Sequence, residues 1–414
     1  MSFIVIIISS CLLGDLLIWY TGASRLRRQK SSGWVRMAFH LFMLMEFAAL
    51  AGIVFGRGSG INMDHYLPRF ALILVYIWHL LVLPAALALT FASGAMRVLR
   101  KGMALLLRPA EPAVFSPMLM QGKPIGRREF LGTAMVLATP LLTLGLGAAG
   151  ASQLSRFRIR RLTLRLPQLP PGLEGLTIVH LTDTHVGRFT HGPVLDRVAQ
   201  ATNELKPDLV VFTGDLINDS LEWLPEATRM LEAVEAPLFL CEGNHDLFID
   251  APRFRKAMKE ARGVTALFNE SVVLEIRGEP VQILGLRWGG PPGWKGPRHD
   301  ERGIAASAQE LLEQRDPVAF PILLAHHPHA WDYAPGIPLT LAGHTHGGQF
   351  MINERMGLGP AMFRYWSGLY TRTQAVPAAV DRVQEELVVS NGSGNWFPLR
   401  IEAPAEIIHL TLTR

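Results

Sequence analysis

Leu339-Thr-Leu-Ala-Gly-His-Thr-His346 contains a short apolar run that is followed at once by a glycine and two histidines. Four other segments have the same order, in which an apolar run ends at polar side chains of the kind that bind metals. Short runs rich in valine, isoleucine, leucine and phenylalanine, separated by stretches of helix length, are typical of buried strands in an α/β sheet. The sequence therefore predicts an α/β fold.

The polar side chains that follow these runs form a candidate metal centre. In open α/β sheets ligands bind at the carboxyl ends of strands, which is where the five segments end. The pairs Asp183-Thr-His185 and His344-Thr-His346 are spaced by one residue, so in an extended chain both side chains of a pair lie on one side and converge. The candidate ligands are Asp183, His185, Asp215, Asn244, His326, His344 and His346.

In their order, the five segments resemble the signature of the calcineurin-like metallophosphoesterases, D-x-H, G-D, G-N-H-D/E, H and G-H-x-H, from about Leu162 to the C-terminus. Within that family the chain is similar to the bacterial membrane-associated branch. The motifs that it shares with this branch are Gly343-His-Thr-His-Gly-Gly-Gln349, Ser367-Gly-Leu-Tyr370 and, in modestly altered form, Ser390-Asn-Gly-Ser-Gly394. The resemblance implies a four-layer α/β/β/α sandwich over residues 160–414.

The resemblance also divides the ligands between two metal ions that Asp215 bridges. It assigns Asp183, His185 and His346 to the first ion, and Asn244, His326 and His344 to the second. Two such ions, held about 3.5 to 4 Å apart, would lower the pKa of a bridging water, so that hydroxide attacks phosphorus. Carboxylate, imidazole and amide ligands suit Mn, Fe, Zn or Co, and among these we expect manganese.

Two residues next to the ligands are implied in proton transfer. His245 is expected to stabilise the transition state or to protonate the leaving oxygen, and Asp246 to orient the ring of His245. Among the other histidines, His327 is expected to be structural or to face solvent, and contact with phosphate is the alternative. The remaining histidines of this part of the chain are expected to be structural or to face solvent, namely His180, His191, His299 and His329.

The first 150 or so residues have a different composition. Four apolar stretches, 2–20, 37–55, 70–91 and 130–151, are each long enough, at roughly 20 residues, to span a bilayer. We therefore expect residues 1–151 to form a membrane domain of about four transmembrane helices, with a kink at Pro84. The ionisable residues Asp15, Glu46 and His79 are expected to join these helices by hydrogen bonds, and a role toward substrate is the alternative.

Basic residues predict the orientation of the helices. The loops after the first and third stretches are rich in arginine and lysine, whereas the loop between them has little beyond Arg57 and Arg69. By the positive-inside rule both rich loops face the cytoplasm, so the domain after the fourth stretch is extracytoplasmic. The arginines at 156–165 oppose this orientation, but long domains translocate largely regardless of charge. Residues 127–131 resemble a twin-arginine export signal, and an ordinary helix anchor is the alternative.

These features predict a multi-pass enzyme of the inner cell membrane that hydrolyses phosphate mono- or diester or pyrophosphate bonds of a lipid-like or cell-envelope substrate. The net charge of +5 arises mostly from arginines that flank the membrane stretches, so it indicates anionic lipid rather than nucleic acid as a partner. A membrane sensor or transport-linked protein that binds a ligand without turnover is the alternative. The complete ligand set argues against that alternative.

Two segments are candidates for contact with the substrate. Residues 353–370 are expected to lie against the bilayer or a lipid chain, because exposed aromatic residues suit the interface, and an ordinary packed core is the alternative. Among its glycines this segment contains Met356, Met362, Phe363, Tyr365 and Trp366. Residues 289–300 are predicted to form a surface loop, and a substrate lid is the alternative.

Overall fold

The computed structural model describes residues 2–58, 66–106, 127–288, 301–353, 355–375 and 382–414. The chain divides into two compact units, Met1–Ala151 and Ser152–Arg414. The segment 289–300, for which a lid was considered, lies outside the described residues.

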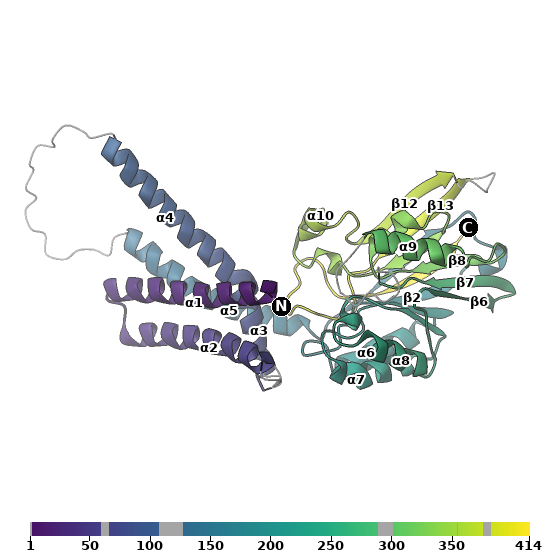
Figure 1. The fold of residues 1–414 in the computed structure, drawn as a ribbon, viewed down its shortest axis with the longest axis horizontal. Coiled ribbons are helices and arrows are strands. Elements are labelled where there is room, and N and C mark those ends of the chain that lie inside the picture. Colours follow the sequence, from purple (N-terminus) through teal and green to yellow (C-terminus); the bar gives the residue numbers. More distant parts are fainter. Residues whose placement is uncertain (1, 59–65, 107–126, 289–300, 354, 376–381) are drawn as a thin grey trace, which may run out of the picture. The chain divides into compact units, whose positions relative to one another are not determined.

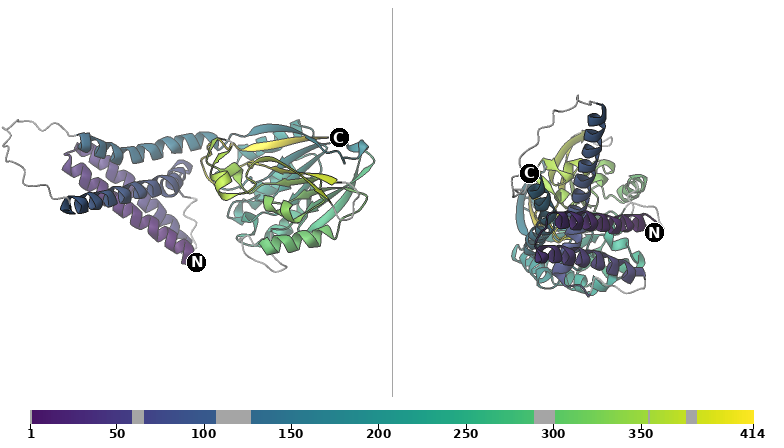
Figure 2. Two further views of the ribbon diagram at one scale, coloured as in Figure 1. Left: turned by 90° about the horizontal axis from the view of Figure 1, so that it is seen from above. Right: turned by 90° about the vertical axis from the view of Figure 1, so that its left-hand side faces the viewer.

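The first unit consists of long apolar helices. They are α1 (Ser2–Arg28), α2 (Gly33–Gly58), α3 (Arg69–Ile77), α4 (Leu83–Leu106) and α5 (Arg127–Gln153). Helix α1 packs against α2 and α4, and the purple helices α1 and α2 lie side by side in both Figure 1 and Figure 2. Because α3 continues into α4, the described residues give four helical segments that are long and apolar enough to cross a membrane. The four apolar stretches are helical, as predicted.

The third of these segments changes its helical winding before Pro84. Residues Trp78–Val82 form a π-helical turn (η2), and the N–H of Leu83 bonds to the carbonyl of Trp78, five residues back instead of four. Proline has no N–H and its ring crowds the carbonyl of the preceding turn, so a widened turn just before Pro84 relieves that crowding. The expected kink is therefore a π-helical turn.

The second unit contains two six-stranded sheets. The first has the order β1 (Arg158–Arg165), β14 (Glu406–Thr413), β2 (Thr177–Leu181), β3 (Leu209–Thr213), β4 (Leu238–Cys241) and β5 (Val264–Ala266). The second has the order β12 (Gly368–Ala375), β13 (Arg382–Val389), β9 (Leu339–Ala342), β8 (Phe320–Leu324), β7 (Glu279–Gly285) and β6 (Glu270–Ile276). Strands β2 to β5 are parallel, and so are β7, β8, β9 and β13.

Helices cover the outer faces of both sheets. Figure 1 shows α6 (Pro193–Glu204), α7 (Leu224–Glu232) and α8 (Ala251–Glu260) over the first sheet and α9 (Glu301–Leu312) over the second. Alternate residues of the strands explain this packing: Val211 and Ile322 lie in the core between the sheets, whereas Phe212 faces the helices of the first sheet. Full burial of such a side chain contributes about 1.5–3 kcal/mol. The predicted four-layer α/β/β/α sandwich is confirmed.

The strands that precede the candidate ligands all end at one edge of this sandwich. In the first sheet these are β2, β3 and β4, and in the second they are β8 and β9. The two sets of loops are joined by hydrogen bonds, since the N–H of His344 after β9 donates to the carboxylate of Asp183 after β2, at 3.0 and 3.1 Å. Loops far apart in the sequence therefore meet between the two sheets.

Candidate metal centre

The seven candidate ligands follow strands that end at this edge, and the side chains of six of them, all except Asn244, approach one another closely. The first cluster contains Asp183, His185 and His346, whose ligand atoms all lie within 4.8 Å of one another. Oδ1 of Asp183 lies 3.3 Å from Nε2 of His346 and 3.7 Å from Nε2 of His185. All three side chains are almost completely buried. This arrangement can enclose one cation.

A second cluster contains Asp215, His326 and His344, again with ligand atoms within 4.8 Å of one another. Oδ2 of Asp215 lies 3.1 Å from Nε2 of His326, and Nδ1 of His344 lies 3.3 Å from the same nitrogen. Oδ2 of Asp215 also lies 3.4 Å from Nε2 of His185, which belongs to the first cluster. Asp215 is therefore placed where it can bridge two cations.

The backbone conformation of the ligands differs from the extended chain that the one-residue spacing suggested. Five of the seven ligands have a left-handed backbone, with φ between 45° and 72°, and these are Asp183, His185, Asp215, His344 and His346. Such conformations are uncommon outside glycine and cost of order 1–3 kcal/mol each, so the surrounding structure must impose them. The side chains converge through tight turns beyond the strand ends and not through strand alternation.

Close packing of glycines against the carboxylates leaves no room for larger residues. A Cβ atom on Gly243 would lie 2.2 Å from Oδ1 of Asp215, and one on Gly343 would lie 2.1 Å from Oδ2 of Asp183. Both carboxylates are thus held against the backbone of a neighbouring loop. Glycine at these two positions fixes where the two carboxylate ligands lie.

Main-chain groups orient the histidine ligands. Nδ1 of His326 lies 2.7 Å from the carbonyl oxygen of Thr213. A carbonyl can only accept, so Nδ1 carries the hydrogen and Nε2, which faces Asp215, keeps its lone pair for a metal. This orientation is the one that a metal-binding imidazole requires.

A buried arginine that the sequence analysis did not identify supports the same loops. Nη2 of Arg400 lies 3.1 Å from Nδ1 of His346, and other guanidinium N–H groups donate to the carbonyls of Asn391 and Gly394. Residues 390–394 contact the first metal loop directly, since a Cβ on Gly394 would lie 1.9 Å from the carbonyl oxygen of Thr184. The motif 390–394, which the chain shares with the family, therefore packs against the loop that carries Asp183 and His185.

His245 lies beside the two clusters, with ligand atoms of His185, Asp215 and His245 within 4.8 Å of one another. Its Nδ1 lies 2.5 Å from the carbonyl oxygen of Asn218. Asp246, which was predicted to orient this ring, instead accepts four backbone N–H bonds, from Asp215, Leu216, Ile217 and Gly243. That prediction is wrong, because the carboxylate of Asp246 is directed at the metal loops. The main-chain carbonyl of Asn218 orients the ring of His245. A sequence motif cannot predict this contact, because every residue has such a carbonyl.

The electrostatics of the site favour positive charge between the carboxylates. Burial alone would raise the pKa of Asp215, but His326 and His245 hold it well below the ordinary value. Burial alone would lower the pKa of His326, yet Asp215 and Asp183 raise it to about 9. In contrast, burial lowers the pKa of His344 to about 3. Ionised carboxylates and a neutral imidazole are the protonation states in which these groups bind metals.

The residues present fit two divalent cations. The donor set consists of oxygen and nitrogen atoms without thiolate, and Oδ1 of Asn244 is buried with no hydrogen-bond partner among the residues that the structure describes. Nε2 of His185 and Nε2 of His346 lie 3.0 Å apart, so two atoms that bind metals through lone pairs face each other. A cation in the first cluster would satisfy the two histidines, and a cation in the second would give the Asn244 oxygen a partner.

The other predicted residues surround the centre in different ways. His327 lies near the second cluster, with its ring 4.9 Å from that of His344, and the ring of Trp288, which the sequence analysis missed, lies 5.1 Å from His344. His180 is buried within β2 and its Nε2 lies 2.8 Å from the hydroxyl of Thr213. His299 lies outside the described residues. Trp288 and His327 therefore form one wall of the site.

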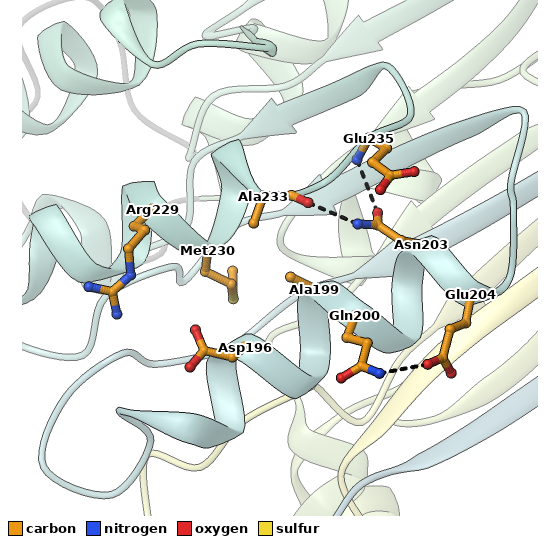
Figure 3. Close-up of a pocket in the computed structure, with 9 residues that line it drawn as sticks. All are labelled: Asp196, Ala199, Gln200, Asn203, Glu204, Arg229, Met230, Ala233 and Glu235. Carbon is orange, nitrogen blue, oxygen red and sulfur yellow. Dashed lines mark hydrogen bonds between the residues drawn. The ribbon is translucent and has the colours of Figure 1, made fainter.

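A surface hollow on the far side of the helical layer does not contribute to this site. Figure 3 shows it between α6 and α7, where Asn203 bonds to the carbonyl of Ala233 and Gln200 bonds to Glu204. None of the candidate ligands lines it. The chemistry is confined to the loops at the strand ends.

Comparison with known proteins finds similarity in the region of the chain that contains the candidate ligands. Residues 176–348 match the family model described as calcineurin-like phosphoesterase, and this segment includes all seven candidate ligands. The chain is 31% identical over 306 residues to the uncharacterized metallophosphoesterase YkuE of Bacillus subtilis, covering 70% of this chain and 98% of the relative.

Two further relatives differ in how much of the chain they match. A transmembrane protein with metallophosphoesterase domain from Danio rerio is 27% identical over 435 residues, which cover 99% of this chain and 89% of the relative. The UDP-2,3-diacylglucosamine pyrophosphatase LpxG of Chlamydia trachomatis is 27% identical over 329 residues, which cover 66% of this chain and 93% of the relative.

Proposed function

The chain belongs to the calcineurin-like metallophosphoesterase family, and we propose that it hydrolyses a phosphate ester or pyrophosphate bond of a lipid-like or cell-envelope substrate. Membership of the family implies a metal-dependent phosphohydrolase. The observation that carries the proposal is the convergence of oxygen and nitrogen ligands from four loops on two adjoining clusters that share Asp215 as a neighbour.

We assign the ligands of two divalent ions from this geometry and from the family pattern. The first ion would be held by Asp183, His185, His346 and the shared Asp215, and the second by Asp215, Asn244, His326 and His344. When bound, the pair of ions supplies Lewis-acid activation of water and of the phosphoryl group. Manganese is our proposal for the metal, because it accepts this mixture of oxygen and nitrogen ligands.

His245 is the proton donor in this proposal. Its Nδ1–H is directed at the carbonyl of Asn218, so Nε2 is the nitrogen that would carry the second proton of an imidazolium and give it to the leaving oxygen. The main-chain N–H of His245 also donates to Oδ1 of Asp215, at 2.8 Å. This hydrogen bond fixes the position of His245 relative to Asp215, the bridging ligand.

An exposed apolar surface next to the site supports a lipid-like substrate. It comprises Ile352, Met356, Leu358 and Met362, which belong to the hairpin β10 (Met351–Asn353) and β11 (Met356–Gly357) and to α10 (Leu358–Met362). These side chains are 45% to 70% exposed. The segment reaches the second cluster, because the ring of Phe363 lies 5.9 Å from that of His344. Such a surface suits an acyl chain or the edge of a bilayer.

The name of one relative supports this substrate class. The name of LpxG specifies a diacylated sugar nucleotide whose pyrophosphate bond is cleaved. In our proposal the phosphate of a comparable lipid-linked molecule reaches the ligands while its acyl chain lies on the apolar surface. The same surface would exclude water from that side of the site.

Kinetic comparison of two substrates tests this assignment. The full-length protein would be assayed on a lipid-linked phosphate and on its water-soluble head group, with Asp215→Asn as the inactive blank. Met362→Ser should reduce turnover of the lipid substrate and leave that of the head group unchanged. Val318→Ser, at a position that is 78% exposed between α9 and β8, serves as the matched control. Equal losses on both substrates in Met362→Ser would remove the lipid assignment.

The same assay separates an enzyme from a ligand-binding protein. Turnover by the wild-type chain that Asp215→Asn abolishes supports the hydrolase. Inactivity on lipid, nucleotide and sugar phosphates, with both metals bound, would favour a sensor or transport-linked role.

We also propose that the chain spans the inner membrane several times with the phosphoesterase unit outside the cytoplasm. The support is the distribution of arginine and lysine between the loops of the first unit. A membrane-impermeant thiol reagent should label Val318→Cys in cells with a permeabilised outer envelope and an intact inner membrane. Labelling only after lysis of the inner membrane would reverse the orientation.

A further inference from the structure

The helices of the first unit enclose a carboxylic acid that has no hydrogen-bond partner. Glu46 of α2 is completely buried, and neither of its carboxylate oxygens is hydrogen-bonded among the described residues. An ionised carboxylate in such a place would be costly by several kcal/mol, because no donor replaces water. The unpaired oxygens therefore point to a missing positive partner, of which a proton is the smallest.

A second buried carboxylic acid lies close by in a different setting. Oδ1 of Asp15, on α1, accepts a hydrogen bond of 2.7 Å from Nε1 of Trp78, and Oδ2 lies 3.0 Å from Nε2 of His79. Asp15 and His79 are 0% and 4% exposed. Both oxygens of Asp15 are thus partnered, in contrast to those of Glu46.

The contacts of His79 fix the number of protons on this pair. Nδ1 of His79 lies 2.9 Å from the carbonyl oxygen of Val75, which can only accept, so Nδ1 carries a hydrogen. The hydrogen bond between Nε2 and Asp15 then needs one more proton, placed either on the imidazole or on the carboxyl group. In both cases Asp15 and His79 together hold one exchangeable proton and have no net charge.

His79 is also the basic group nearest to Glu46. Nδ1 of His79 lies 3.9 Å from Oε2 of Glu46, and the ion pairs of Asp15 and Glu46 among the described residues are both with His79. The thiol of Cys11 lies one turn before Asp15 on α1. One imidazole cannot compensate two carboxylates, so charge balance requires a second proton.

The backbone at this point is irregular. Trp78 and His79 are the first two residues of the π-helical turn between α3 and α4. Inserted π-helical turns occur frequently at functional sites, because they place side chains where a regular helix would not. Here the turn presents two donors to one carboxylate.

We propose that Asp15, Glu46 and His79 form a proton-binding site in the helical unit, in which Asp15 and His79 share one proton and Glu46 holds another. Glu46 can donate its proton toward the imidazole only if Nδ1 of His79 leaves the Val75 carbonyl. The site is therefore a relay of carboxyl, imidazole and carboxyl groups from α1, α2 and η2. It is separate from the phosphoesterase chemistry and from its metals.

Infrared spectroscopy of the full-length protein in lipid nanodiscs tests the proposal. A buried protonated carboxyl group gives a C=O stretching band that is resolved from those of ionised carboxylates and shifts on transfer to D₂O. We expect this band at neutral pH in the wild type and in the control Glu313→Gln, whose position is exposed in the other unit. Glu46→Gln, which is nearly isosteric with the neutral acid, should lose the contribution of Glu46 to this band.

The variants keep the test decisive. Should Glu46→Gln fail to fold, the spectrum of Glu46→Leu is compared with that of the wild type instead, since leucine also removes the carboxyl group. Asp15→Asn should retain the Glu46 band. Absence of the band from the wild type at neutral pH, or its persistence in a folded Glu46 variant that also carries Asp15→Asn, would overturn the proposal.

Discussion

Oδ2 of Asp246 accepts hydrogen bonds of 2.9 Å from the main-chain N–H groups of both Asp215 and Gly243. Asp246 thereby joins the loop after β3, which provides the bridging ligand, to the loop after β4, which provides Asn244. Its other oxygen accepts from Leu216 and Ile217, at 2.9 and 3.2 Å. The carboxylate of Asp246 is the common acceptor that sets the distance between two metal loops.

Asp246→Asn should therefore weaken metal binding and stability together. The amide places an NH₂ group against main-chain N–H donors, and loss of two such bonds to a buried carboxylate costs about 3 kcal/mol. We expect a lower thermal midpoint and less bound metal per chain. Asp250→Asn is the matched control, because asparagine can replace the cap that Asp250 provides for α8. An unchanged metal content in Asp246→Asn would contradict this role.

Replacement of His245 should separate proton transfer from metal binding. His245→Gln is expected to lower kcat by about 10²–10⁴-fold, because a positioned general acid contributes that much, while metal content stays at the wild-type value. His191→Gln, at a ring that lies 5.5 Å from that of Trp223, should match the wild type. Loss of bound metal in His245→Gln would show that the residue acts as a ligand instead.

The contact between Gly343 and Asp183 predicts a large effect from one methyl group. Gly343→Ala places Cβ about 2.1 Å from Oδ2 of Asp183, so the carboxylate must move. Displacement of a ligand by about 1 Å can reduce turnover on the order of 10²-fold. Gly94→Ala in α4, where a Cβ meets no atom within 4 Å, should retain full activity. Wild-type activity in Gly343→Ala would contradict the described packing.

Asp208 predicts a pH dependence of stability that is independent of the metal centre. Burial would raise its pKa, but hydrogen bonds from Thr177 and an ion pair with Arg277 lower the pKa below the ordinary value of 3.8. A carboxyl group whose pKa is lower in the folded state stabilises that state at neutral pH, and this contribution is lost as the pH falls below about 4.

The difference in thermal midpoint between wild type and Asp208→Asn should accordingly be largest near neutral pH and shrink in acid. Asp196→Asn, at an exposed position of α6, controls for the change of net charge. A difference that stays constant across the acid range would contradict the shift.

Much of the fold follows from local sequence. The runs that end at Leu181, Thr213 and Leu324 are apolar on both faces, as buried strands of a layered sheet must be, so their position and the ligands after them could be predicted. The resemblance to the family then supplied the grouping of the ligands.

Other features depend on contacts between distant segments. The left-handed backbone at Asp183 and His346 is imposed by the loops packed against it, and the spacing of two residues does not encode it. Arg400 contacts His346 across 54 residues of sequence, and Asn218 uses a main-chain carbonyl that every residue type has. The orientation of Asp246 was mistaken for the same reason, since its partners are backbone amides.

Elemental analysis of the full-length protein tests the central claim most directly. After removal of metals by a chelator and reloading with Mn²⁺, the wild type should bind two ions per chain and regain phosphoesterase activity, in keeping with the family's two-metal chemistry. Asp215→Asn should bind fewer ions and stay inactive. A folded wild-type chain that binds no metal, or that hydrolyses phosphate esters equally well without it, would contradict the account.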